Sequence, residues 1–170
     1  MILTFVLLDA AQLLDKLEKA QALNSNYVSL YNGQSREALS IVAPYLFSFQ
    51  IESDFAVWLA ESGWGRSWGI YFSSDASPQE LHHHFRKFLI VQNENGQELY
   101  FRFYDPRILR VFLPTCDEEQ LRGFFGPVSH FMMEDADPNQ VLVFSLKEGK
   151  LYTEIKPAKI LVDKKTQLNE

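Results

Sequence analysis

The sequence predicts an α/β (α+β) fold: one domain with a mixed β-sheet, about five flanking helices, and antiparallel strands toward the C-terminus. Three observations support this prediction. Residues 2–8 form an almost continuously apolar run, which is typical of an interior strand covered on both faces. Amphipathic segments that begin at capping residues alternate with short runs of β-branched and aromatic residues. Three such runs close the pattern, at residues 129–133, 141–147 and 151–156, where we expect antiparallel strands.

The first 31 residues read as strand, helix, strand, which is the order of a parallel crossover unit. Asp9 stands where a helix N-cap belongs, directly after the apolar run. The apolar face of the following helix is expected to include Leu13 and Leu14. Residues 27–31 then suit a second strand.

The next segment alternates between strand and helix signals. Pro44 cannot occupy a regular inner strand position because it has no amide to donate, so residues 47–51 are expected to form an edge strand. After a helix and a loop, a further strand is expected to carry Trp68, Ile70 and Phe72 on one side. Ser-Pro-Gln-Glu at residues 77–80 is a capping box that opens another helix.

Asn95-Gly96 predicts a hairpin turn that leads into an aromatic strand over residues 98–104. A period of two separates this strand into two faces, one of pure hydrocarbons and one with polar tips. The hydrocarbon face is Leu99, Phe101 and Phe103, and the other is Tyr100, Arg102 and Tyr104.

A helix start follows the aromatic strand. Asp105 is placed as the N-cap, and Pro106 suits the first helical position, where no amide is lost. We expect one of the two neighbouring arginines, Arg102 or Arg107, to pair with Asp105 or with helix ends, and the other to be solvated. Arg102 between two tyrosines also has the composition of a protein-interface hot spot.

Composition limits the function classes. The 170 residues suit one domain, and the net charge of −6 argues against a nucleic-acid partner. The single cysteine, Cys116, allows no intrachain disulfide and favours a reducing compartment. The apolar start has no basic residue before it, unlike a signal peptide, and it is too short to span a bilayer. We therefore expect a soluble cytoplasmic protein.

The sequence predicts no catalytic or metal site, because each candidate lacks a feature that its chemistry requires. Consecutive histidines, His82–His84, lie about 100° apart on a helix and cannot converge on one ion. Cys116 has no activating base in sequence, and Ser129-His130 lacks the context of a nucleophile elbow. Residues 134–137 lack the glycine and terminal glutamate of a calcium loop and suit a solvated turn. We expect no catalytic residue, metal or cofactor.

Phe-Arg-Phe-Tyr-Asp-Pro-Arg at residues 101–107 resembles the central signature of the type VI secretion adaptor/chaperone family, also called domain of unknown function 4123. The resemblance covers residues 7–128 in order. Its matching pieces are Leu8-Asp9, Leu30-Tyr31 with Gly33, Pro44-Tyr-Leu46, Trp68-Gly69, the helix at residues 81–86, Arg102 with Tyr104-Asp-Pro-Arg107, and Phe124-Phe-Gly-Pro127. We expect a family-like domain over residues 1–156 and a tail over residues 157–170.

The resemblance implies a non-enzymatic cytoplasmic adaptor that binds a secreted effector and helps load it onto the VgrG spike or its tip protein. It implies no nucleic-acid or membrane partner. Many family members continue into a further helical lobe, which this sequence lacks; the sheet domain, a partner or a second copy would then have to hold the cargo. Two alternatives remain: an immunity protein that neutralises a toxin, and a small enzyme with an unrecognised site.

From this reading we select two groups of residues. The expected partner-binding residues are Tyr100, Arg102, Tyr104, Arg107, Trp64, Phe124 and Phe125. The expected structural residues are Asp105, Pro106, Pro44 and Gly69.

Overall fold

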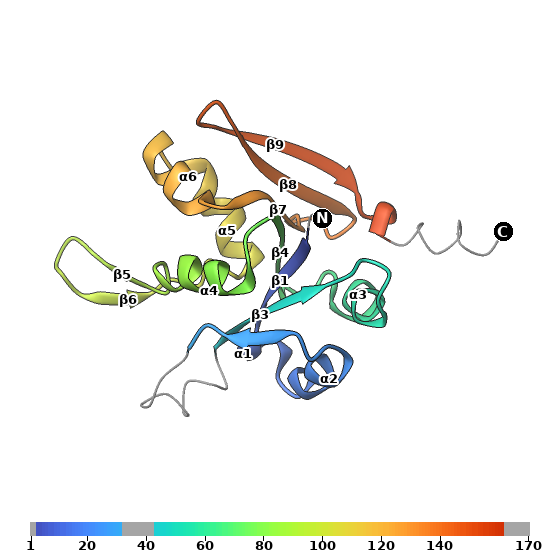
Figure 1. Cartoon of the computed structure of the whole chain (residues 1–170). Helices are drawn as coiled ribbons and strands as arrows, with labels where there is room; N and C mark the ends of the chain where they lie inside the picture. The colour runs from blue at the N-terminus through green and yellow to red at the C-terminus, as the bar shows by residue number, and fades with distance from the viewer. Residues whose placement is uncertain (1–2, 32–42, 162–170) are drawn as a thin grey trace.

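The structure is a computed structural model that describes residues 3–31 and 43–161, and it confirms the α+β fold class (Figure 1). The strands are β1 (Leu3–Asp9), β2 (Tyr27–Ser29), β3 (Pro44–Phe49), β4 (Gly69–Ser74), β5 (Ile90–Gln92), β6 (Glu98–Tyr100), β7 (Val128–Glu134), β8 (Gln140–Lys147) and β9 (Lys150–Pro157). The α-helices are α1 (Ala10–Leu13), α2 (Lys16–Leu23), α3 (Asp54–Trp58), α4 (Pro78–Arg86), α5 (Pro106–Phe112) and α6 (Glu118–Phe125). Three short helical turns are η2 (Leu59–Gly63), η3 (Leu113–Thr115) and η4 (Ala158–Leu161).

Seven strands form one sheet in the order β2-β3-β1-β4-β7-β8-β9, while β5 and β6 form a separate hairpin. Within the described residues, every pair of neighbouring strands is antiparallel, so the predicted mixed sheet is wrong in this respect. β1 and β2 do run in the same direction, as a crossover unit requires. They are not neighbours, however, because β3 lies between them and pairs with both.

β3 is an inner strand of the sheet, so the predicted edge strand is wrong. The position of Pro44 explains how a strand that contains proline can lie there. It is the first residue of β3, where a missing amide interrupts no ladder within the strand. Its carbonyl oxygen still accepts a hydrogen bond from the amide of Leu30, at 2.9 Å. A proline at this end position therefore starts an inner strand without leaving a neighbour unpaired.

Two core layers cover the two faces of the sheet (Figure 1). One lies against α4, α5 and α6 and includes Phe5 and Leu7 of β1. The other lies against α1, α2 and α3 and includes Val6 and Leu8 of the same strand. Because β1 is buried on both faces, its continuous apolar run and its predicted interior position agree with the structure.

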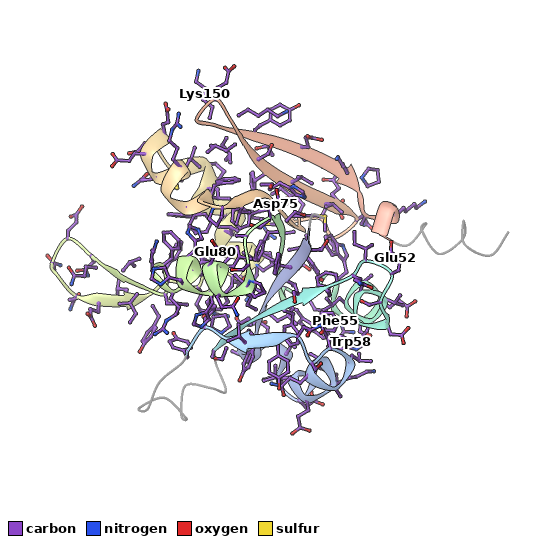
Figure 2. All side chains as sticks on the ribbon, in the orientation of Figure 1. Glu52, Phe55, Trp58, Asp75, Glu80 and Lys150 are labelled. Carbon is purple, nitrogen blue, oxygen red and sulfur yellow. The ribbon has the colours of Figure 1, made fainter. Side chains whose placement is uncertain are left out.

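The second layer holds two departures from the expected helix and strand patterns. The predicted helix after Asp9 is broken at Leu14, which has a positive φ of 53° and is exposed rather than packed. Trp58 of α3 (labelled in Figure 2) packs on Trp68, which precedes β4 and lies on the opposite face from Ile70. The period of two fails there because Trp68 lies outside β4, whose regular strand geometry begins only at Gly69.

The C-terminal strands and the predicted helix starts are confirmed. Ser77 and Glu80 form the predicted capping box of α4, with Pro78 at its first position. β7, β8 and β9 pair in sequence, and the turn before Lys150 is tight. The predicted boundary between domain and tail stays a prediction, and residues 162–170 lie outside the described residues, as does Gly33.

Gly69 is needed where β4 runs beside β1. A Cβ atom at this position would overlap the backbone oxygen of Leu7, which cannot move without disturbing the sheet. We therefore expect Gly69→Ala to lower the free energy of unfolding by about 1–3 kcal/mol in chemical denaturation.

Gly123 in α6 is the matched control, because a Cβ atom there would meet nothing within 4 Å. Gly123→Ala should leave stability unchanged or raise it by about 0.5–1 kcal/mol, through helix propensity. Equal unfolding energies for the two variants would contradict the role assigned to Gly69.

Candidate functional site

The aromatic stretch that the sequence singled out changes direction partway along. β6 ends at Tyr100, and Leu99 and Tyr100 are both exposed, by 49% and 62%. Phe103 and Tyr104 are both buried, although a strand would place them on opposite faces. The predicted pair of faces is therefore wrong after Tyr100, because the chain leaves the hairpin and turns at Arg102 toward α5. Tyr100, Arg102 and Tyr104 do not form one binding face.

A charged cluster, made of Asp9, Arg102, Asp105 and Arg107, lies where this turn meets the end of β1. Asp9 caps α1 by accepting a hydrogen bond from the amide of Ala11, at 2.9 Å. The guanidinium of Arg102 donates to the other oxygen of the same carboxylate, across 93 residues of sequence. It also lies 3.6 Å from Asp105, which caps α5. Arg102 thus links the N-caps of two helices that belong to different core layers.

Arg107 completes the cluster on its outer side. Its backbone amide and its Nε donate to one oxygen of Asp105, at 2.9 and 3.0 Å, and its Nη2 donates to the other at 2.7 Å. Both arginines are therefore paired, so the expectation that one would be solvated is wrong. Asp9 and Asp105 are buried, whereas Arg102 and Arg107 keep part of their side chains in solvent. The two positive and two negative charges balance within the cluster.

The electrostatics of the cluster keep Arg102 and Asp105 ionised and the neighbouring Tyr104 neutral. Burial acts to raise the pKa of Asp105, but hydrogen bonds from Arg107 and the positive charges of both arginines outweigh it, so this pKa lies below its usual value. The hydrogen bond to Asp9 raises the pKa of Arg102. Burial, with the negative charge of Asp9, raises the pKa of the Tyr104 hydroxyl. Asp105 is therefore no proton donor near neutral pH, and Tyr104 is no base.

Trp64 is the most accessible of the three tryptophans, but its loop is held in place by hydrogen bonds. Its indole N–H donates to the carbonyl oxygen of Pro138, at 2.7 Å. Glu134 accepts hydrogen bonds from the amides of Gly65 and Ser67, at 2.7 and 2.8 Å, and from the Ser67 hydroxyl.

Glu134 is a residue that the sequence reading missed, because it assigned this position to a solvated turn. Glu134 instead ends β7 and is buried. Its partners lie 67 and 69 residues away, so no local pattern could have signalled them.

Phe124 and Phe125 belong to the core rather than to a docking surface. Both are buried at the end of α6. The ring of Phe124 lies 5.1 Å from Phe88 and 5.4 Å from Phe131, and Phe125 lies 5.0 Å from Phe131. Replacing either would disturb folding, so the prediction that they bind a partner is not supported by their position.

The three consecutive histidines of α4 have separate environments. His84 is buried and its Nε2 donates to the carbonyl oxygen of Phe124, at 2.8 Å, whereas His83 is exposed. The His82 ring lies 3.0 Å from the carbonyl oxygen of Ser29. Within the described ranges, no three His, Cys, Asp or Glu side chains are grouped as metal ligands.

The remaining nucleophile candidates are not activated. Burial, with the negative charge of Asp117, raises the pKa of the Cys116 thiol, which disfavours the reactive thiolate. His130 faces Ser73 on the neighbouring strand, with Oγ and Nε2 3.3 Å apart, and burial lowers the pKa of His130. Ser129, its neighbour in sequence, is exposed and takes no part in this pair.

Burial of His84 predicts a pH dependence of stability. Burial lowers its pKa below the usual 6.5, although the hydrogen bond to Phe124 partly opposes this. The unfolded chain therefore binds the proton first as pH falls, so the contribution of His84 is complete above about pH 6.5 and is lost below it. His130 acts in the same direction. Thermal melts from about pH 8 to 5 should show falling stability, with a flatter profile for His84→Gln.

His83→Gln is the control for this prediction, since His83 lies on the same helix but is exposed. It should retain the wild-type pH profile. A His84→Gln profile as steep as that of the wild type would contradict the assignment.

Fold and site together define an α+β domain with an antiparallel sheet covered on both faces and an ion-paired joint between two helix starts. More specifically, the chain belongs to the family described as domain of unknown function (DUF4123), whose model matches residues 4–123. The matched segment includes Asp9, Arg102 and Asp105 and ends within α6. No curated protein and no solved structure matches the chain. Among the described residues, no helix combines the length and apolar character needed to cross a membrane.

Proposed function

We propose that this protein is an adaptor or chaperone of a type VI secretion system, which binds an effector in the cytoplasm and helps load it onto the VgrG spike or its tip protein. The observation that carries the proposal is family membership over residues 4–123, together with the role that the family resemblance implies. The role is non-enzymatic: the protein holds another polypeptide and breaks no covalent bond.

The chemistry of the charged cluster supports the non-enzymatic part of the proposal. Its carboxylates and guanidiniums are paired with one another, and Asp105 has a lowered pKa. The Cys116 thiol has a raised pKa. General acid-base catalysis needs a group that titrates near the working pH, and nucleophilic catalysis needs an activated nucleophile. The residues of the charged cluster and Cys116 are therefore better suited to stabilising the fold than to catalysis.

Two measurements test the proposal. The full chain is co-expressed with the products of its neighbouring genes, among which we expect a spike protein and a large toxin, and the complexes are co-purified. We expect a stable complex with the toxin, whose interface would bury about 800 Å² on each partner. In the native bacterium, deletion of the gene should abolish export of that toxin, and a plasmid copy should restore it.

Other outcomes would overturn the proposal. Self-poisoning after deletion, with export unchanged, would identify an immunity protein. Turnover of a small molecule by the purified chain would identify an enzyme. Failure to capture the toxin would remove the adaptor role itself. Arg102 and Tyr104 should not be used as binding-site variants, because the pairing of one and the burial of the other make their loss a folding defect.

A further inference from the structure

The β5–β6 hairpin stands apart from the main sheet (Figure 1). No third strand joins it within the described residues. A two-stranded hairpin is only marginally stable in water, and this one exposes Ile90, Val91, Leu99 and Tyr100. With two strands and exposed apolar side chains, the hairpin therefore resembles a sheet to which a third strand can be added.

The hydrogen-bond register shows which backbone groups face outward. The amide of Phe101 donates to the carbonyl oxygen of Leu89, and the amide of Asn93 donates to that of Gln97. In an antiparallel pair, hydrogen-bonded and non-hydrogen-bonded rungs alternate. The Ile90–Tyr100 and Gln92–Glu98 rungs are therefore the non-hydrogen-bonded ones. Their amides and carbonyls point away from the hairpin, at Glu98 and Tyr100 on the β6 side.

The side chains of β6 give this edge a specific character. Tyr100, the aromatic residue of the hairpin, is 62% exposed, and Leu99 is half-exposed on the opposite face. Glu98 is exposed, and Glu94 at the turn adds a second negative charge. A matching strand would carry apolar side chains beside Leu99 and Tyr100 and a basic side chain beside Glu98.

The edge of the main sheet at β9 is less suited to pairing. Lys150, Lys156 and Pro157 lie along it, and such residues hinder the addition of a strand. The amine of Lys147 also lies 3.4 Å from the ring centroid of Tyr152, which covers one of the exposed aromatics of β9. The hairpin edge lacks a lysine and a proline.

We infer that the outer edge of β6 binds an extended segment of the cargo polypeptide as a third strand, with a basic residue of that segment beside Glu98. This inference rests on the proposed adaptor function and assigns the surface that performs it. Main-chain hydrogen bonds to Glu98 and Tyr100 would supply affinity, and the basic side chain beside Glu98 with the apolar ones beside Leu99 and Tyr100 would supply specificity.

Proline variants test the inference. Tyr100→Ala removes the side chain, and Tyr100→Pro also removes the outward amide while sparing the hydrogen bonds inside the hairpin. Gln92→Pro is the matched control, because it removes the equivalent outward amide on the β5 side. Binding of the purified toxin captured in the co-purification is measured for each. We expect Tyr100→Pro to bind about tenfold more weakly than Tyr100→Ala, and Gln92→Pro to bind like the wild type.

Hydrogen exchange of the unmodified protein gives an independent readout, which does not depend on any variant folding. The toxin should protect the amides of Glu98 and Tyr100, but not those of Ile90 and Gln92. Toxin binding without this protection, or greater loss with Gln92→Pro, would overturn the inference and leave the adaptor function standing. Protection that appears without toxin at high protein concentration would indicate a second copy and would also overturn it. Absence of toxin binding would overturn the adaptor function, and this inference with it.

Discussion

Phe103→Ala is expected to lower the free energy of unfolding by about 3–5 kcal/mol, because it leaves a cavity in the layer between the sheet and α4–α6. The ring is fully buried and packs against several aromatic rings. It lies 5.7 Å from Phe85 in a stacked arrangement and 5.7 Å from Phe124 edge-on. The site cannot collapse easily, since these neighbours are fixed by two different helices.

Leu99→Ala is the control variant, because the sequence pattern and the structure predict different losses of stability for it. Alternation along a strand would give Leu99 and Phe103 the same buried face, but Leu99 is 49% exposed on the hairpin. Its replacement should cost less than about 1 kcal/mol. Denaturant unfolding of both variants measures the difference. Similar losses would show that the hairpin packs against the body in solution.

Arg102→Ala is expected to lower the free energy of unfolding by about 3 kcal/mol, because it leaves the buried carboxylate of Asp9 without its cationic partner. Asp9 has 0% of its side chain exposed. Arg102 is 38% exposed, and solvent screening of the pair places the expected loss at the lower end of the range for buried pairs. Chemical denaturation at neutral pH measures this loss.

A double-mutant cycle with Asp9→Asn distinguishes the ion pair from simple packing. If the charge of Asp9 causes the loss, Arg102→Ala should cost much less in the Asp9→Asn background. Arg107→Ala provides a second control. Arg107 is half-exposed, and Asp105 retains the amide of residue 107 and the nearby Arg102, so its loss should cost less than about 1 kcal/mol. Equal effects of the two arginine variants would contradict the central position of Arg102.

These expectations change the meaning of the sequence motif. Residues 101–107 looked like a binding surface because aromatic and arginine side chains dominate protein interfaces. In the structure, Phe103 and Tyr104 are core residues, and Arg102 and Asp105 join two helix starts. The motif therefore maintains the fold, and the surface proposed for cargo is the hairpin that precedes it.

The sequence by itself determined the features that depend on neighbouring residues. Helix starts at Asp9, Ser77 and Asp105 follow from capping, which is satisfied within three residues. The interior position of β1 follows from its apolar run, and the turn at Gly96 from its left-handed backbone preference. The family was also recognisable from ordered short motifs.

Only the tertiary structure decided which side chains face which surroundings. The placement of β3 between β1 and β2, the pairing of Asp9 with Arg102 and the clamp of Glu134 on the Trp64 loop join residues far apart in sequence. Local periodicity fails at Leu14, Trp68 and Tyr104 because regular helix or strand geometry is interrupted there, and the interruption changes the face on which each side chain lies. Capping is a local interaction, whereas burial is decided by the whole chain.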